Sequence, residues 1–284
     1  MGIAVSDATD AARAAADIVL TQPGLSTIVH GIVEARKIFQ RIKNFLTYRV
    51  AASLQLLLFF FIAVFWFKPR EYMPPDWRSN PAFADPQTGQ PTPWPTYFRM
   101  PVIMLIVITC LNDFSLISIG YDSSDPDTLP SRWNLQALFS VSVVLALVAL
   151  ISSLLLLGLL LASWQPGSLF QRWGLGGVSF GQVTTAVYLK VSVSDFLTLF
   201  SARTGGNFFW SRAPSGPLFG ATVFALSCST VLALAWPPGT LDAVPVVGLA
   251  YLSPNLLAIY VWIYCLVWWG VQDVCKVVSL SLNL

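Results

Sequence analysis

Long apolar runs separated by short polar segments dominate the chain, and the first of them grows out of a helical pattern. From Leu25 apolar residues recur every three or four positions, and this stripe runs into VAASLQLLLFFFIAVFWF with no Pro or Gly between Ile32 and Pro69. The pattern predicts one continuous helix over residues 25–67, about 40 residues and roughly 60 Å long. We expect its first half to be a cytoplasmic stalk that transmits movement and its second half to be a membrane span.

Five further apolar runs are long enough to cross a bilayer. They cover residues 101–120, 137–162, 182–201 and 218–236, and a last run begins with Ser253-Pro254 as N-cap and first helical residue and ends near Val274. The run at 137–162 is almost purely Leu, Val and Ala, so we expect it to face lipid and to hold no polar site. The sequence therefore predicts six membrane-spanning helices, with both chain ends on one side.

The segments outside these runs are short or irregular. Residues 1–24 predict the edge of an α/β domain, with a strand at GIAV, a helix at DATDAARAAA with an Asp cap, and a strand at DIVL. Residues 68–99 hold eight prolines and predict a loop whose tryptophans, Trp77 and Trp94, lie at the membrane interface. Residues 167–181 are a Gly-rich linker, and the acidic turn of Asp122, Asp125 and Asp127 is expected to be solvated.

Composition agrees with an all-α membrane protein. Hydrophobic residues make up 55% and charged residues 11% of the chain, whereas soluble domains average about 25% charged residues. The net charge of +2 does not indicate a nucleic-acid partner. The four cysteines show no Cys-x-x-Cys spacing, and a single histidine, His30, excludes a histidine-based zinc site, so no metal site is expected.

The distribution of Lys and Arg orients the predicted spans, because these residues are enriched on the cytoplasmic side. Five lie on the side opposite the N-terminus: Lys68, Arg70, Arg78, Arg99 and Arg172. Ten lie on the side of the N-terminus: Arg13, Arg36, Lys37, Arg41, Lys43, Arg49, Arg132, Arg203, Arg212 and Lys276. We therefore expect both termini to be cytoplasmic.

One acid, Asp113, stands inside the run at 101–120. A charged group at that depth costs several kcal/mol (about 3 on insertion scales), so such residues usually serve transport. Counted from the cytoplasmic ends of their spans, Gln55 lies about 8 Å deep and Asp113 about 10 Å deep. Asn112 and Thr109, the latter one turn before Asp113, complete a candidate ion-binding set. A single carboxylate suits a proton better than Ca²⁺, which takes about six to eight oxygens; the alternative is a carboxylate paired for structure alone.

The run at 182–201 carries a second pair of charged residues, Lys190 and Asp195. Five positions apart on a helix, they do not share a face, so each is expected to find a partner on another helix. One interpretation is a buried structural ion-pair network. The other is that Lys190 supplies the positive charge that drives a proton off Asp113.

Several segments together resemble the plasma-membrane proton-pumping P-type ATPases (type III). The segment GIAVSDATDAARAAADIVLTQPGLSTIV is similar to the end of their phosphorylation domain, IFQRIKNF (38–45) to the stalk of their fifth helix, and LNDFSLIS (111–118) to their sixth helix. AVYLKVSVSD (186–195) and VWIYCLVWWGVQDVCK (261–276) are similar to their eighth and tenth helices. The resemblance covers almost the whole chain.

The resemblance implies that the six spans are helices five to ten of such a pump and that Asp113 is the proton acceptor and donor. It implies a pump that exports H⁺ across the plasma membrane and that uses ATP and Mg²⁺ when intact. The chain lacks the DKTGT phosphorylation loop, the GDG hinge, the nucleotide domain, the TGES actuator and the first four helices. In plant-type members an arginine that assists proton release takes the place of Gln55.

We therefore expect a C-terminal fragment. Residues 1–24 would be a remnant of the phosphorylation domain, 25–67 the stalk with the first span, 68–99 the extracytoplasmic loop, 100–276 five further spans and 277–284 a cytoplasmic tail. Its expected partners are the bilayer, protons and the missing N-terminal half. Three alternatives stay open: a passive proton leak, a half-pump that pairs with a separate catalytic chain, and a pump for another cation.

Overall fold

The computed structural model describes residues 2–21, 26–85, 89–124, 133–172, 176–251 and 256–281. Within these residues, six helices are long and apolar enough to cross a membrane. This confirms the all-α membrane fold with six candidate spans. The helices are α2 (Ser26–Trp66), α3 (Val102–Ile117), α4 (Leu135–Leu161), α6 (Phe180–Ala202), α7 (Gly216–Ala235) and α8 (Leu257–Ser281).

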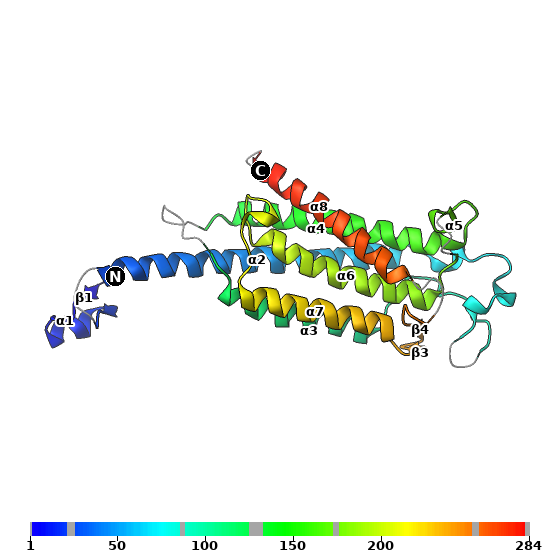
Figure 1. Cartoon of the computed structure of the whole chain (residues 1–284), viewed down its shortest axis with the longest axis horizontal. Coiled ribbons are helices and arrows are strands. Elements are labelled where there is room, and N and C mark those ends of the chain that lie inside the picture. Colours follow the sequence, from blue (N-terminus) through cyan, green and yellow to red (C-terminus); the bar gives the residue numbers. More distant parts are fainter. Residues whose placement is uncertain are drawn as a thin grey trace.

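Helix α2 is the long continuous helix that the sequence predicts, with 41 residues. It projects beyond the bundle and carries the small N-terminal unit at its free end (Figure 1). Its buried side chains begin only at Asn44 and then follow one stripe to Ala63, so the bundle starts near Asn44 and the preceding turns form the stalk.

The N-terminal unit consists of β1 (Ile3–Ala4), α1 (Asp10–Ala15) and β2 (Ile18–Val19). The two strands pair in parallel, as a strand–helix–strand unit requires. Thr9, and not an Asp as expected, caps α1: its Oγ1 accepts a hydrogen bond from the backbone N–H of Ala12. Threonine is among the preferred N-cap residues, although it ranks below aspartate.

Helix α6 is the centre of the bundle. Every residue of α6 except Phe200 is buried, and the helix contacts α2, α3, α4, α7 and α8. Ser179 and Gln182 form a capping box that fixes its first turn. Lys190 and Asp195 therefore lie inside protein and not against lipid.

Helix α4 departs from its prediction. Half of its most apolar window is buried inside the bundle, and its backbone and serines bind polar side chains of neighbouring helices. The expectation of a lipid-facing helix without a polar site is wrong, because a nearly uniform apolar sequence does not reveal which face packs against protein.

The end of the bundle opposite the N-terminus holds the 68–99 loop and a hairpin (Figure 1). In the described residues of the loop (68–85 and 89–99), three short 3-10 helices occur: Pro69–Tyr72, Trp77–Ser79 and Pro81–Phe83. Trp94 is buried against Phe83 and Phe180, so its predicted place at the membrane interface is wrong. Trp77 is half-buried and packs against the same core. Tryptophan has enough apolar area to join a core as readily as an interface.

The hairpin, β3 (Gly239–Leu241) with β4 (Val244–Val246), was not predicted. Its turn residues Asp242 and Ala243 both adopt positive φ angles, 51° and 59°, although Asn-Gly is the usual signal for such a turn. Asp242 also accepts a hydrogen bond from the backbone N–H of Val102 at 3.0 Å, so the hairpin holds the start of α3.

Several boundaries shift slightly. The predicted Gly-rich linker contains a short helix, α5 (Leu169–Arg172). Helix α8 continues to Ser281, beyond the predicted end near Val274 and into the expected tail. Ser253-Pro254, Asp125 and Asp127 lie outside the described residues. The division of the chain into five segments stays a prediction.

Candidate functional site

Asp113 forms an ion pair with Arg49 of α2, whose Nη1 donates to Oδ1 of the carboxylate. Both side chains are about half exposed at the surface of the bundle, 46% for Arg49 and 56% for Asp113. Asp113 therefore lies on the outer surface of the helix bundle and not in its interior. Its partner is an arginine that the sequence assigned only to the positive cytoplasmic end.

The residue of α2 that contacts Asp113 is Arg49 and not Gln55, which the sequence-based depth estimate placed near Asp113. Gln55 lies six residues beyond Arg49 along α2, about 9 Å at 1.5 Å per residue. The estimate counted depth from Val50, where the apolar run begins, but the bundle begins at Asn44. Counting from Asn44 brings Arg49 to the level of Asp113.

Asn112, the neighbour of Asp113 in sequence, points into the bundle. It is buried, and its Nδ2 donates to Oδ2 of Asp195 on α6 at 2.9 Å. Consecutive helical residues project about 100° apart. Adjacent residues of α3 therefore have different surroundings. Asp113 lies at the surface and pairs with Arg49, whereas Asn112 points inward and contacts the buried carboxyl of Asp195.

Buried polar atoms without a hydrogen-bond partner concentrate on the helices around this contact. In the part of the chain that the structure describes, four such atoms lie on α2, α3 and α6. They are Gln55 Nε2, Asn112 Oδ1, Ser115 Oγ and Asp195 Oδ1. Buried polar atoms are nearly always bonded, so Asn112 and Asp195, which contact each other and each keep one oxygen unpartnered within the described residues, can take a further polar partner.

Lys190 and Asp195 each bind a different helix, as their spacing predicts. The Nζ of Lys190 donates to the backbone oxygen of Ala149 at 2.9 Å and to Oγ of Ser153, both on α4. No ion pair joins Lys190 to Asp195 among the described residues. Thr109 lies on the exposed side of α3, where its hydroxyl donates to its own helix at Leu105 and Ile106.

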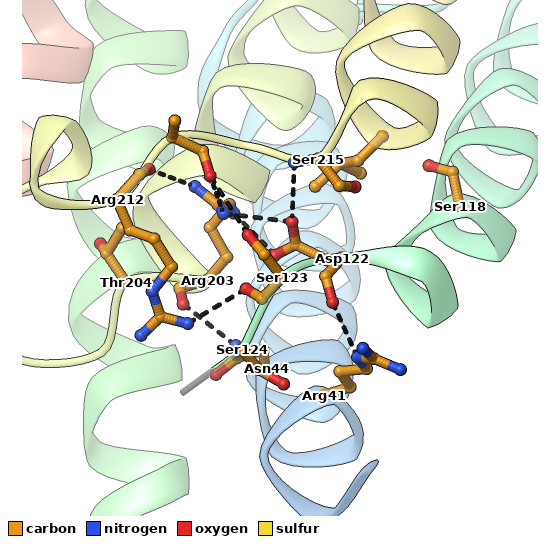
Figure 2. A network of polar contacts seen from close by, with 12 residues as sticks. Arg41, Asn44, Ser118, Asp122, Ser123, Ser124, Arg203, Thr204, Arg212 and Ser215 are labelled. Atoms are coloured by element: carbon orange, nitrogen blue, oxygen red, sulfur yellow. Dashed lines mark hydrogen bonds and ion pairs between the residues drawn. The ribbon is translucent and has the colours of Figure 1, made fainter. Parts of the chain in front are cut away.

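A second polar cluster joins the membrane bundle to the stalk, and its centre is the ion pair of Asp122 with Arg203 (Figure 2). Arg203 donates from Nε and Nη2 to the two carboxylate oxygens at 2.8 and 3.1 Å. Both side chains are almost completely buried. The prediction of a solvated Asp122 is therefore wrong, since its charge is matched by a residue 81 positions away.

The stalk helix contributes two side chains to this cluster, which we call the Asp122–Arg203 joint. Arg41 donates to the backbone oxygen of Asp122 at 2.7 Å, and Asn44 donates to the backbone oxygen of Arg203 at 3.0 Å. Figure 2 shows both reaching the joint from the same helix. The joint therefore connects α2 to the end of α3 and to the loop after α6.

A second buried ion pair lies within α8, between Asp273 and Lys276 at 2.7 Å. Lys276 also donates to the backbone oxygens of Ser201 and Asn207, and Asp273 accepts from the backbone N–H of Phe209. This pair therefore ties α8 to the last turn of α6 and to the loop that follows it.

The described residues do not provide an evident metal centre: no group of three or more His, Cys, Asp or Glu side chains is placed to hold an ion. Mg²⁺ binds through carboxylates together with water and phosphate oxygens.

Comparisons with known proteins give these contacts a context. Over 98% of its length the chain is 46% identical to two Leishmania donovani proteins named as proton ATPases 1A and 1B. Over 99% of its length it is 27% identical to a Methanocaldococcus jannaschii protein named as a cation-transporting ATPase. The chain spans 28% of the length of each of these curated relatives. No family model matches the chain.

Proposed function

We propose that this chain, whose resemblance to the proton-pumping P-type ATPases is confirmed by these relatives, forms the C-terminal membrane part of an ATP-driven pump that exports H⁺ across the plasma membrane. Asp113 is the proton acceptor and donor. The observation that carries this assignment is the Arg49–Asp113 ion pair between two candidate membrane helices. A charged pair in such helices is costly and is kept where transport uses it.

Arg49 supplies the release charge, a role for which the sequence offered Lys190. Lys190 instead donates to Ala149 and Ser153 of α4, whereas Arg49 contacts Asp113. While the guanidinium contacts Asp113, it favours the ionised carboxylate, so a bound proton is expelled. When α2 moves and separates the pair, the carboxylate loses its counter-charge and accepts a proton. Arg49 belongs to the same continuous helix as the stalk, so a stalk movement repositions it directly.

The remaining features of the proposal follow from the charge pattern and the resemblance. Both termini lie on the cytoplasmic side, because Lys and Arg are concentrated there. In the intact pump, ATP with Mg²⁺ would phosphorylate an aspartate outside this chain and drive the stalk. The donor set supports H⁺ over another cation, since no acidic cluster suited to a metal ion occurs among the described residues.

A chimaera tests the proposal. This chain replaces the matching 28% of the Leishmania proton ATPase 1A, and ATP-driven acidification is followed in vesicles with a pH-sensitive dye. We expect acidification by the chimaera and none with Asp113→Asn. Arg49→Gln is expected to slow transport at least tenfold while ATP hydrolysis continues, because release loses its driving charge.

Glu71→Gln is the matched control, since Glu71 forms an exposed ion pair with Lys68 away from the site. We expect it to transport like the parent. Full acidification with Asp113→Asn would refute the assignment. Proton flux through the isolated chain in liposomes without ATP would instead establish the passive leak, and co-purification with a separate catalytic chain would establish the half-pump.

A further inference from the structure

The described residues contain three buried carboxylates, and one of them lacks a cation. Asp122 contacts Arg203 at 2.8 Å and Asp273 contacts Lys276 at 2.7 Å. Asp195 is equally buried, at 2% exposure, but no ion pair reaches it in the described ranges. We propose that Asp195 is a second proton-binding carboxyl and that it holds a proton in the conformation in which Asp113 is paired with Arg49.

The number of bonds to each acid supports this assignment. Asp122 accepts three hydrogen bonds at its carboxylate, two from Arg203 and one from the backbone N–H of Ser215. Asp195 accepts one, from Asn112, and its Oδ1 has no partner within the described residues. An ionised carboxylate buried with a single neutral donor is costly, and binding a proton removes the charge.

The charged and titratable groups around Asp195 do not replace the missing cation. Lys190 lies on the same helix but donates to Ala149 and Ser153 of α4. From α2 the nearby titratable group is Tyr48, which is fully buried and lies within electrostatic range of both Asp195 and Asp113. Arg49, also on α2, pairs with Asp113 of α3 and not with Asp195.

Asn112 suits a carboxyl that changes its protonation state. An amide offers two donors on nitrogen and an acceptor oxygen. Its Nδ2 donates to Asp195 as observed, and its Oδ1, which has no partner among the described residues, can accept a bond from a protonated Asp195 after rotation of the amide. Ser115 Oγ, one turn along α3, is a second polar atom without a partner there.

The proposed pump then has two proton-binding carboxyls, Asp113 and Asp195. They are linked through α3, because Asp113 is next in sequence to Asn112, which contacts Asp195. Asp113 responds to Arg49 at the bundle surface, and Asp195 responds to Asn112 inside. A shift of α3 that changes one contact changes the other. A role of Asp195 in transport rests on the proposed function. The presence of a proton on Asp195 does not, because it can be measured in this chain alone.

Infrared spectroscopy of the purified chain in bilayers of ether-linked phosphatidylcholine tests the inference. Those lipids lack ester carbonyls, so a carbonyl band of a protonated carboxylic acid is visible at neutral pH and shifts in D₂O. We expect this band in the parent chain, its loss in Asp195→Asn and its persistence in Asp113→Asn. Asp195→Glu keeps the acid and is expected to move the band without removing it, which covers the case in which Asp195→Asn does not fold.

Absence of the band from the folded parent chain would overturn the inference. Its persistence in Asp195→Asn, or an unchanged band in Asp195→Glu, would also overturn it, because the proton would then sit elsewhere. The measurement needs no ATP and no transport. A band on Asp195 in a chain whose chimaera does not pump would refute the proposed function and leave this inference standing.

Discussion

The Asp122–Arg203 joint allows a stability prediction that needs only this chain. Asp122→Asn keeps the shape of the side chain but removes its charge, so Arg203 stays buried without a counter-charge. The asparagine amide also places N–H groups against a guanidinium that can only donate. Two hydrogen bonds from Arg203 and one from Ser215 converge on the carboxylate in the native protein.

Removing one partner of a buried ion pair costs about 3–5 kcal/mol. At about 1.4 kcal/mol per tenfold change, this raises the unfolded population by roughly 10² to 10³·⁵. For a chain of this size, about 2–4 °C of Tm is lost per kcal/mol, which predicts a decrease of about 6–20 °C.

Thermal unfolding of the purified chain in one detergent, followed by circular dichroism at a fixed scan rate, measures this decrease. Glu71→Gln is the matched control, because it removes the same charge from a pair whose side chains are 62% and 68% exposed. An exposed pair contributes about 0–1 kcal/mol, so the control should lose no more than about 4 °C. Equal Tm values for the two variants would show that the joint does not stabilise the fold.

Three further substitutions probe other parts of the structure by the same unfolding assay. Lys276→Gln should lower the stability by about 3–5 kcal/mol, because Asp273 would lose its buried counter-charge; a Tm like that of Glu71→Gln would contradict this. Ala243→Gly should raise the stability by up to about 1 kcal/mol, since the residue has φ of 59° and glycine adopts that angle without strain; a lower Tm would count against the turn geometry. Gly248→Ala should cost about 1–3 kcal/mol, because the added Cβ would lie 2.5 Å from the backbone oxygen of Leu234; an unchanged Tm would mean that this contact is not tight.

Most residues of the candidate site could be identified from the sequence, but the contacts between them could not. Asn112, Asp113, Lys190 and Asp195 stand out because polar residues are rare in apolar runs. Arg49 was missed because it stands directly before the apolar run that begins at Val50. A positive charge at that place is ordinary at the cytoplasmic end of a span. That the bundle begins at Asn44, which brings Arg49 to the depth of Asp113, follows only from the burial seen in the structure.

The joint was harder to predict. Asp122 and Arg203 both sit at helix ends, where charged residues are ordinarily solvated, and 81 positions separate them. Nothing in either local pattern indicates that the two ends meet. The burial of Trp94 has the same origin, since its place depends on the distant Phe83 and Phe180.

By itself the sequence determined the six apolar helices, the unbroken helix that joins stalk to bundle, and the polar residues placed inside them. These features are local, because apolar length and the 3.6-residue period act over a few turns. Only the tertiary structure decided that Asp113 meets Arg49 instead of Gln55 and that Asp195 meets Asn112 without a cation. The physical reason is that such contacts depend on how far each helix slides and rotates against its neighbours, which packing of the whole bundle sets.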